Sequence, residues 1–304
     1  MPPRELLHPR HWPTWLGLGL LVVLTRLPYR WQLQIGKTIG LLLHKVGRSR
    51  RHIADVNIGI CFPEKSEQER QQLVRQIFID NGIGLMETLM GWFRQPDYLL
   101  DRTSFHGFEQ VKEAQARGQG VMLLGAHYSM LDLAGALVSN VQRVNISYRP
   151  QDNPVMNYLM ERGRAALYDQ CFTRKDIRAF IRTLKNGEVL WYAQDQDFGR
   201  KNSVFVDFFG HPAATITATS RIAKAGKALV MPITYFRRED NRGYDVRVHP
   251  PLNIPSGDDV EDARIANAFI ESQLREHPSQ YLWLHKRFKT SPDVTEKKGL
   301  LYKR

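Results

Sequence analysis

Cysteine is scarce in this chain of 304 residues, which contains only Cys61 and Cys171. The two cysteines form no C-x-x-C motif, and neither belongs to a cluster of cysteines and histidines with the spacing of a zinc site. The sequence therefore predicts neither a disulfide framework nor a structural zinc site, and a reducing compartment fits best. We expect an active site that uses no metal ion and no cofactor.

A long hydrophobic run is also missing. The most apolar segment covers residues 12–27, fewer than the roughly 20 residues that a helix needs to cross a bilayer. No small-x-small pattern follows it, so a cleaved signal peptide is not expected. The segment is interpreted as a short or partly inserted membrane anchor, and the alternative is a buried helix of a soluble protein.

Basic residues are unevenly distributed around this apolar segment. Those at its end and after it are Arg26, Arg30, Lys37, Lys45, Arg48, Arg50 and Arg51, against Arg4 and Arg10 before it. The positive-inside rule then predicts that the body of the protein lies in the cytoplasm. Apolar residues at helical spacing between 35 and 46 are typical of an amphipathic helix on a membrane surface, although a core-facing helix gives the same pattern. Residues 1–50 are thus predicted to form an N-terminal membrane anchor and amphipathic helix.

Acidic residues are too few to balance the basic ones. The formal net charge is +12, so the partner of this protein is expected to be anionic. Nucleic acid, anionic lipid and an acidic carrier protein all satisfy that condition. No nucleic-acid-binding motif is present, which disfavours the first.

The predicted secondary structure changes near residue 100. Residues up to about 95 are predicted to be helical, with one long helix over 66–93 that begins at a capping box of Ser66 and Glu69. From about 105, short apolar runs alternate with helical patterns. Strands are expected at 121–126, 144–148, 188–193, 229–236 and 244–249, and helices at 108–117, 130–141, 154–167, 175–186, 215–225 and 260–276. This alternation predicts an α/β fold, with a sheet covered by helices on both faces.

His127 and Asp132 form an H-x-x-x-x-D pair where an apolar strand pattern gives way to a helical one. The spacing by itself is as common as chance, so the argument depends on position. Catalytic groups of α/β proteins lie at the carboxyl ends of strands. There an imidazole can act as a general base, and a carboxylate can fix its tautomer and stabilise the imidazolium.

Two arginines follow the second predicted strand. Arg149 comes directly after that strand, and Arg164 lies in the next predicted helix. Either is suited to bind an anionic group of a substrate. The alternative is a solvated loop arginine at 149 and a surface ion pair at 164.

Asp195 and Asp197 leave the predicted strand 188–193 and enter a loop that contains Gly199. Two carboxylates at a strand end can orient a polar substrate or support the His127 site. No further ligand that would complete a metal site is apparent nearby. The alternative is a pair of turn-forming aspartates.

Two later segments are rich in aromatic side chains, and the second also contains cations. Residues 203–215 are rich in aromatic side chains, which suits either an apolar groove for an alkyl chain or simple core packing. Residues 283–289 combine three cations with aromatic residues, which suits contact with an anionic partner or a solvated basic face.

Together these motifs resemble the late acyltransferases of lipid A assembly, the lauroyl and myristoyl transferase family of Gram-negative inner membranes. The matching segments are 51–63, 127–132, 148–154, 187–193, 195–197, 203–206 and 283–290. They occur in the family's order over about three quarters of the chain. One departure is Asp132, where close relatives often carry glutamate; the wider glycerolipid acyltransferase superfamily uses aspartate.

The resemblance implies a mixed sheet of the glycerol-3-phosphate acyltransferase type, with an acyltransferase domain over residues 51–304. It implies transfer of a fatty acyl chain from acyl carrier protein to a hydroxyl on the acyl chains of a Kdo-bearing lipid A precursor. His127 would deprotonate that hydroxyl and Asp132 would orient His127, while Arg164, Asp195, Arg149 and Asp197 would bind substrate. The location implied is the cytoplasmic side of the bacterial inner membrane.

Two other functions remain as alternatives. An acyltransferase of the same chemistry could act on a glycerophospholipid or a glycolipid. A membrane-bound protein without catalytic activity that binds anionic lipid or nucleic acid is compatible with the charge alone. Neither chain length nor the acylated position follows from the sequence, because a chain-measuring pocket depends on packing detail.

Overall fold

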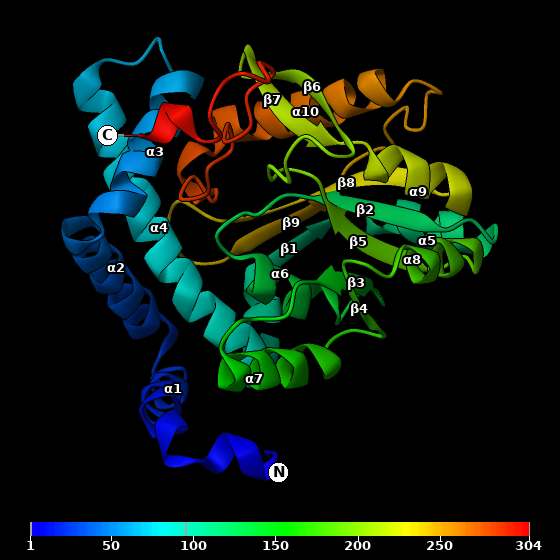
Figure 1. The fold of residues 1–304 in the computed structure, drawn as a ribbon. Helices are drawn as coiled ribbons and strands as arrows, with labels where there is room; N and C mark the ends of the chain where they lie inside the picture. Colours follow the sequence, from blue (N-terminus) through cyan, green and yellow to red (C-terminus); the bar gives the residue numbers. More distant parts are fainter. Residues whose placement is uncertain (1, 95, 304) are drawn as a thin grey trace.

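The computed structural model describes residues 2–94 and 96–303 (Figure 1). Within these residues a seven-stranded sheet has the strand order β1-β9-β8-β2-β5-β3-β4, and β6 and β7 form a separate antiparallel pair. The strands are β1 Thr103–His106, β2 Val121–Gly125, β3 Asn145–Tyr148, β4 Cys171–Thr173, β5 Val189–Ala193, β6 Ser203–Phe208, β7 His211–Ile216, β8 Leu229–Arg237 and β9 Tyr244–Val248. Every neighbouring pair in the large sheet is parallel except β8 and β9. The sheet is therefore mixed, as the resemblance implies.

Helices precede the sheet and connect its strands. The α-helices are α1 Trp12–Leu24, α2 Tyr29–Val46, α3 Arg48–Cys61, α4 Glu67–Phe93, α5 Phe108–Ala116, α6 Leu131–Val138, α7 Pro154–Ala165, α8 Ile177–Lys185, α9 Ala218–Gly226 and α10 Asp259–Glu276. Short 3₁₀ helices cover Arg4–Leu7, Pro9–His11, Pro96–Arg102, Pro278–Gln280 and Leu300–Tyr302. Figure 1 shows α2, α3 and α4 along one side of the molecule, with α1 and the N-terminus below them.

The central strand β2 is buried on both faces. Its side chains alternate between two apolar clusters: Val121 and Leu123 join one, and Met122 and Leu124 join the other. The first cluster contains residues of α4, α5 and α6, and the second contains residues of α8 and α9. Helices thus cover both faces of the sheet, as predicted, and β2 reads as a continuous apolar run because neither of its faces meets water.

The five predicted strands and the long helix are confirmed. The capping box is present at the start of α4, where the Ser66 hydroxyl accepts from the Glu69 N–H and the Glu69 carboxylate accepts from the Ser66 N–H at 2.8 Å. Four strands were not predicted. β1 and β4 are the short edge strands of the large sheet, and β6 and β7 form the hairpin within the aromatic segment.

The apolar N-terminal segment forms a helix of 13 residues, α1. Across residues 2–94 and 96–303, no helix combines the length and the apolar character needed to cross a membrane. Several large apolar side chains of α1 and α2 are nonetheless exposed: Trp12, Leu16, Leu20, Val23, Leu42, Leu43 and Val46. In α2 Trp31 near the N-terminal end is exposed as well, while Ile35 and Ile39 pack against the core.

Helices α2 and α4 approach each other at glycines. A methyl group on Gly36 would lie 2.6 Å from the Ile83 Cα, and one on Gly40 would lie 2.3 Å from the Phe78 carbonyl oxygen. On the opposite helix, a methyl group on Gly82 would lie 2.4 Å from the Gly36 carbonyl oxygen. The two backbones are thus in direct contact, which only glycine permits.

A cluster of ionisable side chains is buried between α4 and the sheet. Arg237, at the end of β8, donates to Asp80 and, over 3.0 Å, to Glu87 on α4. Tyr244 on β9 also donates to Glu87 at 3.0 Å, and its own hydroxyl accepts from Tyr29 at the start of α2. Through Arg237, Glu87 and Tyr244 this cluster joins α2, α4, β8 and β9.

Candidate active site

His127 and Asp195 meet at one edge of the sheet. Strands β2 and β5 are parallel neighbours, and Gly125 at the end of one is in register with Ala193 at the end of the other. Each strand is followed two residues later by a functional group, His127 after β2 and Asp195 after β5. The pairing of the strands therefore places both side chains together, as expected for carboxyl ends in a parallel sheet.

Asp195 holds His127 through two contacts. One carboxylate oxygen lies 2.7 Å from the imidazole Nδ1, and the other accepts the His127 backbone N–H at 2.9 Å. A carboxylate at Nδ1 selects the tautomer with the proton on Nδ1, which leaves Nε2 able to accept a proton. Asp195 is 1% exposed and His127 is 28% exposed, so the carboxylate is enclosed while the ring reaches the surface of the site.

The charge of Asp195 tunes the imidazole. Burial lowers the pKa of His127, but the charge and the hydrogen bond of Asp195, with a smaller contribution from Asp132, outweigh it and raise the pKa above its ordinary value. The pKa of Asp195 itself is held below its usual range, because His127 and its hydrogen bonds outweigh the effect of burial. The pair is thus a strengthened base with an ionised carboxylate behind it.

Asp132 makes a different contact from the predicted one. It lies in the first turn of α6, and one of its carboxylate oxygens accepts from Arg164 Nη2 at 2.8 Å and Nε at 3.2 Å. Arg164 reaches it from the last turn of α7. The hydrogen bond to His127 that was expected from Asp132 is made instead by Asp195, because β5 is the immediate neighbour of β2. Asp132 acts on His127 through its charge.

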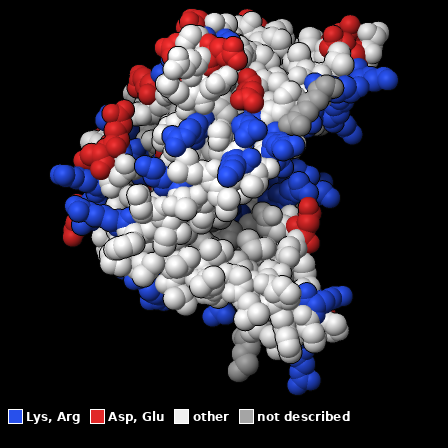
Figure 2. Space-filling model, turned by 90° about the vertical axis from the view of Figure 1, so that its left-hand side faces the viewer, with Lys and Arg blue, Asp and Glu red and all other residues white. Residues whose placement is uncertain are grey.

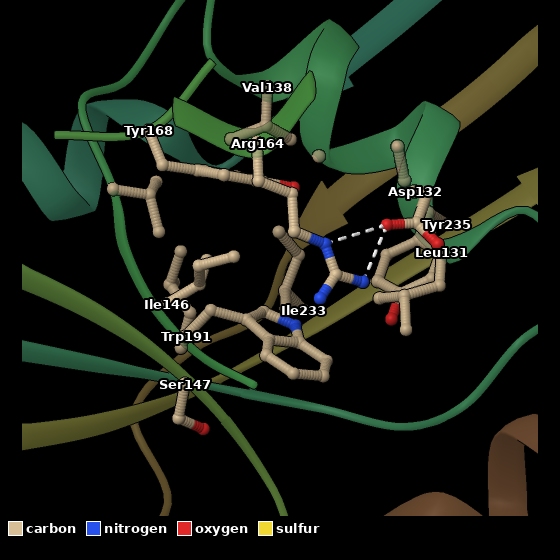
Figure 3. Close-up of a pocket in the computed structure, with 14 residues that line it drawn as sticks. Leu131, Asp132, Val138, Ile146, Ser147, Arg164, Tyr168, Trp191, Ile233 and Tyr235 are labelled. Carbon is tan, nitrogen blue, oxygen red and sulfur yellow. Dashed lines mark hydrogen bonds and ion pairs between the residues drawn. The ribbon is translucent and has the colours of Figure 1, made fainter. Parts of the chain in front are cut away.

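An apolar cavity lies beside this ion pair (Figure 3). It has about 520 Å³ of empty volume, part of it open to solvent. Its walls are side chains of β2, β3, β5, β8 and α6, with polar groups at Asp132, Ser147, Arg164, Tyr168, Trp191 and Tyr235. Trp191 also contacts His127 edge-on, with 6.3 Å between the ring centroids. The indole therefore connects the histidine with the cavity.

The segment after α10 supports the histidine from behind. The His127 carbonyl accepts the Leu282 N–H at 3.0 Å, and Tyr128 and Tyr281 form an antiparallel bridge. Tyr281 also donates its hydroxyl to the Asp195 carbonyl at 3.3 Å. This support was not predicted from the sequence, since the segment is about 150 residues away along the chain and its tyrosine carries no distinctive pattern.

Asp197 and Arg149 lie apart from this cavity. The Asp197 carboxylate accepts from the Gly199 N–H at 2.8 Å, from the Thr290 hydroxyl at 2.9 Å and from the Thr290 N–H at 2.7 Å. Such a saturated, buried carboxylate corresponds to the turn-stabilising alternative. The Arg149 side chain is 65% exposed and pairs with Asp152 at 3.4 Å. Of the six predicted site residues, the described structure brings together His127, Asp132, Arg164 and Asp195.

The two aromatic segments are mainly core. Phe208 and Phe209 of the β6–β7 hairpin are buried, and neither lines the apolar cavity. In the segment 283–289, Trp283 is buried and Arg287 is 2% exposed, with its guanidinium donating to the Ala214 carbonyl at 2.9 Å. For the first segment the structure shows core packing, the second of the two interpretations given above. In the second segment Arg287 is not part of a solvated basic face, because its buried guanidinium binds β7.

A histidine with a raised pKa, held by a buried carboxylate beside an apolar cavity, is the arrangement of an enzyme that activates a hydroxyl next to an apolar chain. Comparison with known proteins agrees. The family model for bacterial lipid A biosynthesis acyltransferases matches residues 3–290. The chain therefore belongs to the bacterial lipid A biosynthesis acyltransferase family.

Individual relatives differ in the acyl group that their names give. The lipid A biosynthesis lauroyltransferase of Escherichia coli K12 is 41% identical over 292 residues, 95% of each chain. The palmitoleoyltransferase of the same strain is 35% identical over 290 residues, again 95% of each chain. The myristoyltransferase is 30% identical over 288 residues, 93% of this chain and 88% of the relative. The protein is an acyltransferase of lipid A biosynthesis, and the three names do not fix its acyl group.

Proposed function

We propose that the protein transfers a fatty acyl chain from acyl carrier protein to a hydroxyl on an acyl chain of a Kdo-bearing lipid A precursor. The carrying observation is the position of His127: its Nδ1 is held by Asp195, and its ring contacts Trp191, which lines the cavity together with Asp132 and Arg164. The acyl chain of the donor occupies the apolar cavity. The thioester lies at the end of the cavity nearest His127.

The chemistry follows from the free Nε2 of the imidazole. This nitrogen takes the proton of the acceptor hydroxyl as its oxygen attacks the thioester carbon. The carbon–sulfur bond breaks, and the thiolate of the carrier leaves and takes the proton back from the imidazolium. Asp195 stabilises the imidazolium, and the ion pair of Arg164 with Asp132 supplies a guanidinium next to the developing oxyanion.

The charge and the exposed apolar side chains support an acidic carrier protein, a phosphorylated lipid and a membrane surface as partners. The net charge of +12 favours an acidic carrier protein and a phosphorylated lipid. Figure 2 shows basic side chains across the middle of one face of the molecule, with a largely uncharged zone below it. The exposed apolar side chains of α1 and α2 suit partial insertion below the level of the headgroups. We place the protein on the inner membrane with its catalytic domain on the cytoplasmic side.

The test supplies acyl carrier protein loaded with chains of defined length, and offers lipid A precursors and lysophospholipids as acceptors in parallel. Mass spectrometry of the products identifies the acceptor and the acyl chain. We expect one additional acyl chain on the lipid A precursor. Transfer to lysophospholipids alone would overturn the proposed acceptor.

His127→Ala is the matched variant for the mechanism. We expect its rate to fall by about 10³-fold, the middle of the range for loss of a general base, with the thermal unfolding temperature nearly unchanged. A retained rate in the folded variant would remove His127 from the mechanism. It would also revive the alternative of a lipid-binding protein whose function does not depend on catalysis.

A further inference from the structure

The indole nitrogen of Trp191 is a buried hydrogen-bond donor without an acceptor among the described residues. A buried N–H that makes no hydrogen bond costs about 1–3 kcal/mol, so such groups call for a reason. Several other buried polar atoms share this condition, but Trp191 is the one among them whose side chain lines the cavity together with Asp132 and Arg164. Its location therefore distinguishes it.

The indole is held in this position by the sheet. Trp191 is the third residue of β5, and its backbone is in register with Leu123 on β2 and Ile146 on β3. Beside it, a methyl group on Gly125 would lie 2.3 Å from the indole nitrogen. Glycine at the end of β2 thus makes room for the nitrogen-bearing edge of the ring.

Two donors converge at this end of the cavity. Figure 3 draws the nitrogen of the Trp191 indole on the side of the ring that faces Arg164, whose guanidinium reaches over the ring to Asp132. The same indole contacts the His127 ring edge-on. The two donors therefore lie on the same side of the cavity, and the indole also adjoins the base.

We propose that Trp191 is a catalytic residue whose indole N–H donates to the thioester carbonyl oxygen as that oxygen becomes negatively charged. This inference rests on the proposed function. Arg164 supplies the second donor, and together the two groups form the oxyanion site. The proton transfer and the breaking of the carbon–sulfur bond are those described above, and the indole keeps its proton throughout.

The test replaces Trp191 by an isostere that lacks the N–H. Benzothienylalanine, inserted at position 191 by nonsense suppression, keeps the size and shape of the indole but has sulfur in place of the nitrogen. Tryptophan inserted by the same suppression is the matched control, and Trp191→Phe is a second variant. Each is assayed with acyl carrier protein thioester and lipid A precursor.

We expect kcat to fall by about 10²-fold, as for the loss of one oxyanion donor, while KM for the acyl donor stays within about twofold. The pH at which kcat/KM rises should stay at its wild-type value, because the indole is neutral and His127 keeps Asp195. The unfolding temperature should be that of the control.

Three results would overturn the inference. The first is a kcat within about twofold of the control, since one oxyanion donor contributes far more. The second is a loss carried entirely by KM, which would make Trp191 a wall of the cavity. The third is a loss that coincides with a shifted pH profile, which would make Trp191 a support for His127. If these occur while the control transfers acyl groups to lipid A precursor, the proposed function stands; if the control transfers none, both fall.

Discussion

Two ionic clusters of this protein use the same side chains in different surroundings. In one, Arg237 pairs with Asp80 and Glu87 and the three side chains are 2%, 6% and 0% exposed. In the other, Arg164 pairs with Asp132 and the side chains are 15% and 16% exposed, at the wall of a cavity. The first cluster joins elements of the fold. The second leaves a guanidinium beside the space where a substrate can enter.

The difference shows how burial decides what an ion pair does. The enclosed Arg237 donates its hydrogen bonds to other groups of the protein. Its removal leaves the carboxyl groups of Asp80 and Glu87 in the core without their cation. A partly open arginine keeps donor capacity for an anionic group, and its removal is tolerated because water can reach Asp132. The same substitution is therefore expected to cost mainly stability in the first cluster and mainly activity in the second.

The largest expected effect is on stability. Arg237→Met should lower the free energy of unfolding by about 3–5 kcal/mol, as for breaking one partner of a buried ion pair. Chemical denaturation measures this loss. Burial raises the pKa of Glu87, and removing Arg237 takes away the charge that opposes this effect. A carboxyl group with a raised pKa stabilises the fold at low pH, and this contribution is lost as the pH rises, so the destabilisation should grow as the pH rises above about 4.5, the ordinary pKa of glutamate.

Arg164→Met is the matched substitution in the other cluster. Its free energy of unfolding should fall by less than in Arg237→Met, because Arg164 and Asp132 are 15% and 16% exposed and water can reach the remaining carboxylate. Its kcat should fall by about 10²-fold with loss of an oxyanion donor. Equal losses of stability in the two variants would break the comparison.

The next effect separates the two aspartates near His127. Asp195→Asn should lower kcat/KM by about 10²-fold, because the amide no longer stabilises the imidazolium. His127 acts as a base only when neutral, so kcat/KM rises with pH through its pKa. Asp195 is what raises that pKa most, and the rise should therefore move to lower pH in the variant. A pH–rate profile measures the shift.

Asp132→Asn provides the comparison for that profile. Asp132 contributes less than Asp195 to the raised pKa of His127 and makes its hydrogen bonds to Arg164. We expect a smaller shift of the profile in the same direction. A larger shift for Asp132→Asn than for Asp195→Asn would return the orienting role to Asp132.

The smallest effect is expected at Arg149. This side chain is 65% exposed and its pair with Asp152, at 3.4 Å, is worth at most about 1 kcal/mol. Arg149→Ala should change kcat and KM by less than about twofold. A rise in KM that is confined to acyl carrier protein would show instead that Arg149 binds the donor.

The strands that could be predicted are those whose burial produces an apolar run in the sequence. β2, β5 and β8 lie in the middle of the sheet and are continuous apolar runs, so their existence followed from composition alone. β1 and β4 are short strands at its edges, where half-buried residues give no such pattern. The β6–β7 hairpin was hidden because its aromatic residues serve packing between segments distant in sequence.

The site was predictable as a set of residues but not as a set of pairs. His127, Asp132, Arg164 and Asp195 all follow or face strand ends, which the sequence reveals. The partner of His127 depends on β5 lying next to β2, and strand order is a property of the assembled sheet. Trp191 was visible in the sequence as part of a strand, yet its unpaired nitrogen becomes apparent only when its neighbours are in place.

The glycine contact of α2 with α4 has a consequence for the direction in which the active site faces. Helix α4 also backs the catalytic turn: a methyl group on its Gly84 would lie 2.3 Å from the Ser129 carbonyl oxygen, and one on Gly91 would lie 2.9 Å from that of Asp132. The backbones of α2 and α4 touch, and so do those of α4 and residues 129–132. A displacement of α2 would therefore also move α4 and residues 129–132. If α2 lies on the membrane as proposed, the angle between α2 and the membrane sets the direction in which the cavity opens. This holds although no described residue of α2 lines the cavity.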